Sequence, residues 1–477
     1  MGGEFKEKVA QGVAWSMAEK IGSMLLAMAV RLVILRLLTR DILGFMSIPS
    51  AVVTVLLVIV DSGFSQSLVR HKGPSQSDYK SVFLFNIAVS AVLYGVLVTL
   101  APFAARWYGM PEIARIAPVF FLLLPLNALC AVQNTIFIRQ FRFALLSKVT
   151  FLSSLAGGLT AIALAMAGWG IWSLVAERVI AVGMRTALLW WLSDWRPCGK
   201  CGLKPLREMA PFGCSLMVTD LISNFYNKIP QFFLGKLYSP AVLGSFDQAV
   251  KLKDMPAATG IQAVQNVTFP ALAKIRDDAP KFAEGYRQVV MVVSYVMFPI
   301  MLGMSAVARD MFAVLLGEEW MPTVPYFEAV CLAGLFSPIA LTAYNVLKAR
   351  CKGPLIVRLE VVKKIIMTAI FAVTIPHSVM AVVWGLVAIA FCEMAVNFLA
   401  TMRFTSLTFR RFVRTLLPVA LVSGTMYLLV RLTAAAIPGN DLVRLLAELA
   451  TGVVSYLALS ALFRLEARGA DLYALAY

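Results

Sequence analysis

The chain has 477 residues, of which 60 % are apolar and only 14 % are charged, and its formal net charge is +17. This composition, with a mean hydropathy of +0.80, excludes a soluble globular protein. The lysines and arginines concentrate in every second loop between long apolar stretches, which is how topology is set in a membrane. No DNA- or RNA-binding motif accompanies them, so the expected contacts are membrane lipids and not nucleic acid.

The apolar stretches, taken in chain order, predict an all-α polytopic membrane protein of about fourteen transmembrane helices, each near the ~20 residues that cross a bilayer. The positive-inside rule places both termini in the cytoplasm. No loop is long enough for a soluble catalytic domain, so an enzyme is not expected. The expected spans are 11–38, 43–66, 80–104, 114–138, 144–168, 171–193, 208–237, 240–270, 286–314, 324–348, 355–376, 378–402, 412–436 and 441–464.

A weak internal repeat divides these spans into groups. Shifting the chain by 200 positions places Leu43-Gly44 on Leu243-Gly244. We therefore expect two six-helix lobes in the same orientation, followed by two extra helices and a cytoplasmic tail. Internal repeats of this kind are common in transporters. The expected boundaries are 1–207, 208–410 and 411–477.

Prolines occur inside several spans, Pro118 and Pro230 among them, and indicate bent helices. Charged residues also occur inside spans, where each costs ~2.5–3.5 kcal/mol on insertion scales, so they point to function. Those expected to line a hydrated, cationic cavity for an anionic substrate are Arg31, Arg185, Lys228, Lys251 and Lys364, with Asn224 and Asn227. The alternative is internal pairing, for example between Asp247 and Lys251 at i,i+4 spacing.

Coupling to H+ or Na+ would require a carboxylate within the membrane. The candidates are Asp61, Asp220, Asp247 and Glu393. No cofactor is expected, because the sequence has no phosphate-binding glycine loop, nucleophile elbow or metal-ligand spacing. Cys198 and Cys201 form a C-x-x-C motif, but a structural zinc site requires four ligands. The two residues are therefore interpreted as reduced cysteines in a loop.

Several landmarks together resemble the Wzx-type polysaccharide and O-antigen exporters. This family, which includes the colanic-acid and teichuronic-acid exporters, belongs to the multidrug/oligosaccharidyl-lipid/polysaccharide superfamily. The landmarks are Arg36-Leu37-Leu38, Leu43-Gly44, Asp61-Ser62-Gly63, Leu68-Val69-Arg70, Arg139-Gln140-Phe141-Arg142-Phe143, Leu234-Gly235-Lys236, Leu243-Gly244-Ser245-Phe246, Ala249-Val250-Lys251-Leu252, Phe269-Pro270-Ala271-Leu272-Ala273 and Gly317-Glu318-Glu319-Trp320.

The resemblance implies a flippase in the bacterial cytoplasmic (inner) membrane. Its cargo would be an undecaprenyl-diphosphate-linked oligosaccharide for lipopolysaccharide, capsule or exopolysaccharide, moved by alternating access. A polysaccharide polymerase and a chain-length regulator would be its partners. Many relatives carry an acidic residue shortly before the Gly-Lys, where this chain has Pro230. Asn227, Lys228 or Asp220 would then take over its role, or the role is absent.

Three other functions stay open on the sequence alone. A multidrug extrusion antiporter of the same superfamily would share the lobes, but the surplus of basic groups disfavours cationic cargo. A peptidoglycan-precursor flippase would share the helices and the anionic cargo. A membrane-bound polysaccharide polymerase is disfavoured because no large extramembrane loop is present.

Overall fold

A computed structural model describes residues 22–463, apart from positions 23, 62, 72, 199–201, 257–278, 351–352 and 406–407. Cys201, the stretch 269–273 and the tail beyond residue 463 therefore lie outside the described residues. Throughout the described ranges the regular structure is helical. The chain divides into two compact units, Met1–Gly244 and Ser245–Tyr477, which are taken in turn below.

The first unit begins with a helical segment at 24–37 and ends with the first turns of another at 240–256. Between them lie α2 (Arg40–Asp61), α3 (Phe64–Arg70), α4 (Gln76–Tyr108), α5 (Glu112–Phe120), α6 (Leu123–Arg139), α7 (Phe143–Met166), α8 (Ile171–Leu192) and α9 (Leu203–Leu237).

Local sequence signals fix both ends of α4. The Ser75 hydroxyl accepts a hydrogen bond from the Asp78 amide at 3.2 Å, and the Asp78 carboxylate accepts one from the Ser75 amide at 2.7 Å. This reciprocal arrangement satisfies two amides that the first turn of a helix leaves unpaired. The helix ends at Gly109, whose φ of 69° suits a residue without a side chain.

Prolines interrupt the span expected at 114–138. The structure places two helices there, α5 and α6, separated at Phe121 and Leu122. Pro118 lies inside α5, and Pro125 has no amide proton with which to bond the Phe121 carbonyl one turn earlier. The Leu124 amide bonds that carbonyl instead, at 3.0 Å. Together the two helices form one candidate membrane span, Glu112–Arg139, and the break between them agrees with the bend that the prolines predict.

Small residues allow helices of the first unit to approach closely. A Cβ added to Gly157 of α7 would lie 2.5 Å from the Glu177 carbonyl oxygen and 2.9 Å from the Ala181 Cβ of α8. Packing of this kind holds membrane helices together, because lipid tails leave little hydrophobic driving force between helices.

The second unit continues the helical segment that starts at residue 240. It then contains α11 (Ala279–Ala306), α12 (Ala308–Leu315), the 3-10 helix η1 (Glu318–Thr323), α13 (Val324–Arg350), α14 (Gly353–Thr374), α15 (Val379–Thr401), α16 (Phe409–Ala436) and α17 (Asp441–Leu462). The span expected at 286–314 is divided at Val307, where α12 starts as a separate short helix.

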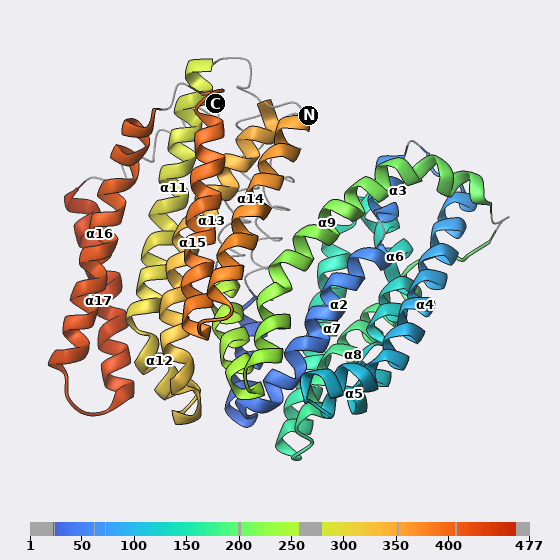
Figure 1. The fold of residues 1–477 in the computed structure, drawn as a ribbon, viewed down its shortest axis with the longest axis horizontal. Coiled ribbons are helices and arrows are strands. Elements are labelled where there is room, and N and C mark those ends of the chain that lie inside the picture. The colour runs from blue at the N-terminus through green and yellow to red at the C-terminus, as the bar shows by residue number, and fades with distance from the viewer. Residues whose placement is uncertain are drawn as a thin grey trace. The chain divides into compact units, whose positions relative to one another are not determined.

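The core of the second unit joins α11, α13, α15 and α16, with α17 packed on α16. Phe398 and Phe412 stack with ring centroids 3.9 Å apart. Figure 1 shows α16 and α17 as an adjacent pair of helices, and they pack against each other along their length. The two expected C-terminal helices therefore belong to this unit.

Within the described ranges, nine helical stretches are long and apolar enough to cross a membrane. The helices α8, α9 and α14 have sufficient length but carry more charge; α8, for example, contains Glu177, Arg178 and Arg185. These three helices carry the site candidates Arg185, Asp220, Asn224, Asn227, Lys228 and Lys364.

Candidate functional site

An arginine and a carboxylate come together in the first unit. Arg185 of α8 donates a hydrogen bond from Nη2 to the Asn134 side-chain oxygen of α6 at 3.0 Å. Asp61, at the exposed end of α2, lies close enough to Arg185 for their charges to attract. Arg185, a predicted substrate-binding residue, and Asp61, a predicted ion-coupling residue, are therefore neighbours in the first unit.

The candidates on α9 form a stripe along one side of the helix. Asp220, Asn224, Asn227 and Lys228 are spaced at i, i+4, i+7 and i+8, which places them on the same helix face. The Asn224 amide group donates to the Asp220 backbone carbonyl at 2.8 Å. Lys228 is half-buried, and no side chain in the described part of the chain pairs with its ammonium group. It is the candidate cation best placed to accept an anion.

Lys251 has an acidic partner. Its ammonium group lies 2.5 Å from the Asp247 carboxylate, one turn earlier on the segment 240–256. The Asp247 side chain is 4 % exposed and that of Lys251 is 36 % exposed. The internal pairing that the i,i+4 spacing predicted is therefore confirmed. Lys251 neutralises the charge of a buried carboxylate, and this role does not depend on a contact with substrate.

A second charged cluster lies on α13, α14 and α15. Lys363 is 2.5 Å from Glu360, and its ammonium group lies 4.9 Å from the Tyr344 ring centroid. Glu393 of α15 is close enough for its charge to interact with those of Lys363 and Lys364. Lys364, the residue expected to bind substrate, is half-buried, whereas Lys363 is only 8 % exposed. The sequence analysis selected Lys364 and not Lys363, the more buried of the two lysines.

Arg31 lies on the helical segment 24–37 and is half-buried. Its neighbours on that helix include Val30, which packs against Gly158 of α7. Arg31 already takes part in an interaction within the chain. The structure thus places it at a packed helix surface.

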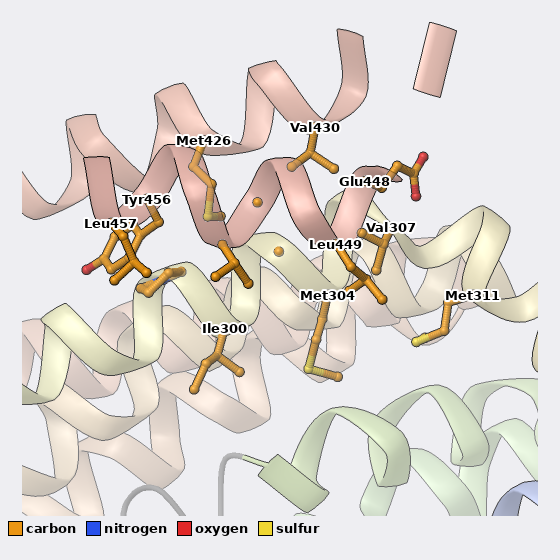
Figure 2. Close-up of a pocket in the computed structure, with 14 residues that line it drawn as sticks. Ile300, Met304, Val307, Met311, Met426, Val430, Glu448, Leu449, Tyr456 and Leu457 are labelled. Atoms are coloured by element: carbon orange, nitrogen blue, oxygen red, sulfur yellow. The ribbon is translucent and has the colours of Figure 1, made fainter. Parts of the chain in front are cut away.

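An apolar groove lies between α11 and the pair α16–α17. It has a cavity volume of about 440 Å³, within the range of small-molecule sites. Figure 2 shows its labelled side chains, among them Met304, Met426 and Leu457, on these helices. Glu448 of α17 is the only ionisable carboxyl in the lining, and it lies at one end of the groove.

Sequence reasoning missed the charged cluster beside this groove. Arg444 donates to both carboxylate oxygens of Asp310, with 2.7 Å between Nε and Oδ2, and it also donates to Asp441 at 2.7 Å. Glu448, one turn further along α17, is 1 % exposed. The i,i+4 spacing of Arg444 and Glu448 inside an expected span was a signal that could have identified them. Asp310 is 134 positions away and gave no such signal.

The sequence of this chain matches a known protein family. The family model described as "Polysaccharide biosynthesis protein" matches residues 33–325, which is more than half of the chain. The succinoglycan biosynthesis transport protein ExoT of Rhizobium meliloti is 24 % identical over 331 residues, 69 % of this chain and 67 % of that protein. The lipopolysaccharide biosynthesis protein WzxC of Escherichia coli is 20 % identical over 368 residues, 75 % of this chain and 73 % of that protein.

Solved structures share the fold. The lipid II flippase MurJ in an inward closed conformation matches with a TM-score of 0.76 at 12 % identity, over 94 % of this chain and 98 % of that one. An inward-facing MATE transporter matches with a TM-score of 0.59 at 12 % identity, over 86 % and 99 %. The expected fold class and the resemblance are thereby confirmed. The chain belongs to the polysaccharide biosynthesis protein family and is a multi-pass membrane transport protein.

Proposed function

We propose that this transporter moves an undecaprenyl-diphosphate-linked oligosaccharide from the cytoplasmic to the periplasmic leaflet of the inner membrane. The observation that carries the proposal is the half-buried cation Lys228 on the polar stripe of α9, in a family of polysaccharide transport proteins. A diphosphate is the part of such a lipid that a lysine or arginine would bind.

The basic residues have different parts in this proposal. Lys228 and Arg185 bind the diphosphate or acidic sugars, and Asn224 and Asn227 bind sugar hydroxyl groups. Lys364 and Arg31 contribute positive charge to the same cavity. Lys251 shares its charge with Asp247, so its direct contribution to an anion is smaller.

Transport requires two states that respond differently to the ligand. We propose six-helix lobes with boundaries at 1–207 and 208–410 that rock about a central cavity, with both chain termini in the cytoplasm. The distribution of basic loops supports this orientation. Asp61, Asp220, Asp247 and Glu393 are the carboxylates proposed for H+ or Na+ coupling, and Asp61 has support from its nearness to Arg185.

The polyprenyl chain is proposed to follow α16 and α17. The groove between them and α11 is lined almost entirely by apolar side chains and has a volume of about 440 Å³. Such a lining suits an isoprenoid and offers nothing to a sugar. A long chain would occupy the groove in part and lipid for the remainder.

Deleting the gene and measuring surface glycan tests the function directly. We expect loss of the polysaccharide together with accumulation of its lipid-linked repeat unit inside spheroplasts, where an added glycosidase cannot reach it. Purified protein in liposomes should expose that lipid to the outer glycosidase. If a peptidoglycan-precursor flippase mutant is rescued instead, the substrate is lipid II. Glycan lengthening in the liposomes would indicate a polymerase.

A further inference from the structure

The carboxyl group of Glu448 has an unusual environment for an acid. The residue is 1 % exposed, and its Oε2 has no hydrogen-bond partner among the residues that the structure describes. An ionised carboxylate in this position would lose hydration with no hydrogen-bond donor at Oε2 to replace it. Glu448 also lines the apolar groove, so it borders the space that a lipid chain would fill.

Its nearest charged neighbour is another carboxylate. The side chains of Asp310 and Glu448 are within hydrogen-bonding reach of each other. Arg444 binds both oxygens of Asp310 and so stabilises the ionised form of that residue. A proton shared by the two acids therefore resides on Glu448, which can donate it to Asp310.

Two cations, Arg444 and Arg431, attract the Glu448 carboxylate by charge, but each forms an ion pair with another acid. On α17, Arg444 is already bound to Asp310 and Asp441. On α16, Arg431 pairs with Glu328 of α13 at 3.3 Å, with its side chain 42 % exposed. On α12, Arg309 is exposed and acts on Asp310 from a distance. On α17, Tyr456 lines the groove, and its hydroxyl donates to the Tyr295 carbonyl of α11 at 2.6 Å.

We propose that Glu448, with Asp310 as acceptor, is a proton-binding site, and that an apolar chain in the groove binds when Glu448 is neutral. Identification of that chain as polyprenyl rests on the proposed function. A chain in the groove displaces the water that would hydrate an ionised Glu448, so occupancy favours the protonated acid. By reciprocity, release of the proton to water weakens binding of the chain.

Infrared titration of the purified protein in lipid nanodiscs tests the proton site without any substrate. We expect the carbonyl-stretch band of a protonated carboxylic acid, and its disappearance as the pH rises, in the wild-type protein. Glu448→Gln should lose this titrating band, because the amide keeps the shape and the donor but cannot ionise. Glu318→Gln, at an exposed acid of η1, should retain it. An unchanged band in Glu448→Gln would overturn the proposal.

Binding of radiolabelled undecaprenol tests the linkage. This uncharged probe does not titrate, so any pH dependence belongs to the protein. We expect wild-type affinity to fall by about fivefold or more as Glu448 ionises, as for an ordinary coupling between two sites. Glu448→Gln should bind at all pH values with the affinity of the protonated wild type, and Glu318→Gln should behave as wild type. Persistent pH dependence in Glu448→Gln would exclude the linkage.

The two experiments separate this inference from the proposed function. If undecaprenol does not bind the wild-type protein at any pH, both the placement of the polyprenyl chain and the linkage fail. The infrared titration still decides whether Glu448 holds a proton. If the proton and the linkage are found but lipid-linked oligosaccharide is not transported, the proposed function alone fails.

Discussion

Gly44 and Gly244 meet backbone to backbone, each near the start of its helix. A Cβ on Gly44 would lie 1.9 Å from the Pro240 carbonyl oxygen, and a Cβ on Gly244 would lie 2.1 Å from the Arg40 carbonyl oxygen. Residues 40 and 240, like 44 and 244, differ by the same 200 positions as the sequence repeat. The two halves of the contact, Gly44 with Pro240 and Gly244 with Arg40, are therefore related by the sequence repeat and have nearly the same geometry.

Gly44→Ala should disfavour this conformation. The added methyl group has to push one helix away from the other, which costs about 1–3 kcal/mol or more. We expect surface glycan to fall severalfold, and Gly244→Ala to act in the same way. The matched control is Gly95→Ala on α4, where an added Cβ meets nothing within 4 Å. Export at the wild-type level in both variants would mean that this close approach is not needed for transport.

The pair Lys251–Asp247 separates a structural role from substrate binding. Lys251→Met should lower the melting temperature, because it removes the ammonium group that pairs with a buried carboxylate, at a cost of about 1–3 kcal/mol. The double variant Asp247→Asn, Lys251→Met should recover protein abundance. Asp247→Asn alone shows how much export depends on the acid itself. Recovery of the double variant to the export level of Asp247→Asn shows that Lys251 only balances Asp247, whereas a further loss shows a direct contact of Lys251 with the anion.

Lys228 gives the sharpest test of an anion-binding cavity. Lys228→Met should reduce glycan export strongly without lowering the melting temperature, since the lysine holds no partner among the described residues. Lys228→Arg should retain more activity, because the charge is kept. Lys148→Met on the exposed first turns of α7 is the control and should export normally. Normal export by Lys228→Met would remove this residue from the proposed site.

The sequence predicts the helices well and the side-chain partners poorly, for physical reasons. The span expected at 441–464 is α17 (Asp441–Leu462), because a run of apolar residues of that length has one stable form in a bilayer. The pairing of Asp247 with Lys251 was also foreseeable, since i,i+4 spacing is local. Arg444 with Asp310 was not, because tertiary packing alone brings together residues 134 positions apart.

Asp310 should make stability depend on pH. Burial raises its pKa, but hydrogen bonds with Arg444 and Glu448 outweigh burial and hold the pKa below its ordinary value. A depressed pKa contributes stability above the unfolded value of about 3.9 and loses it as the pH falls through the folded pKa. Asp310→Asn should therefore melt lower than wild type at neutral pH, and the difference should shrink on acidification below about pH 4. Asp441→Asn, at an exposed carboxylate, should show a much smaller difference.

Filling the groove should stop transport without unfolding the protein. Gly452 of α17 lies in the lining, and a Cβ added there makes ordinary contact with Val430 at 3.4 Å. A tryptophan at this position would extend into the groove and exclude an isoprenoid chain. Gly452→Trp should lose both glycan export and undecaprenol binding while keeping its abundance in the membrane. Val454→Trp is the control, because Val454 is 66 % exposed and lies outside the lining. Equal export by the two variants would show that the substrate does not use this groove.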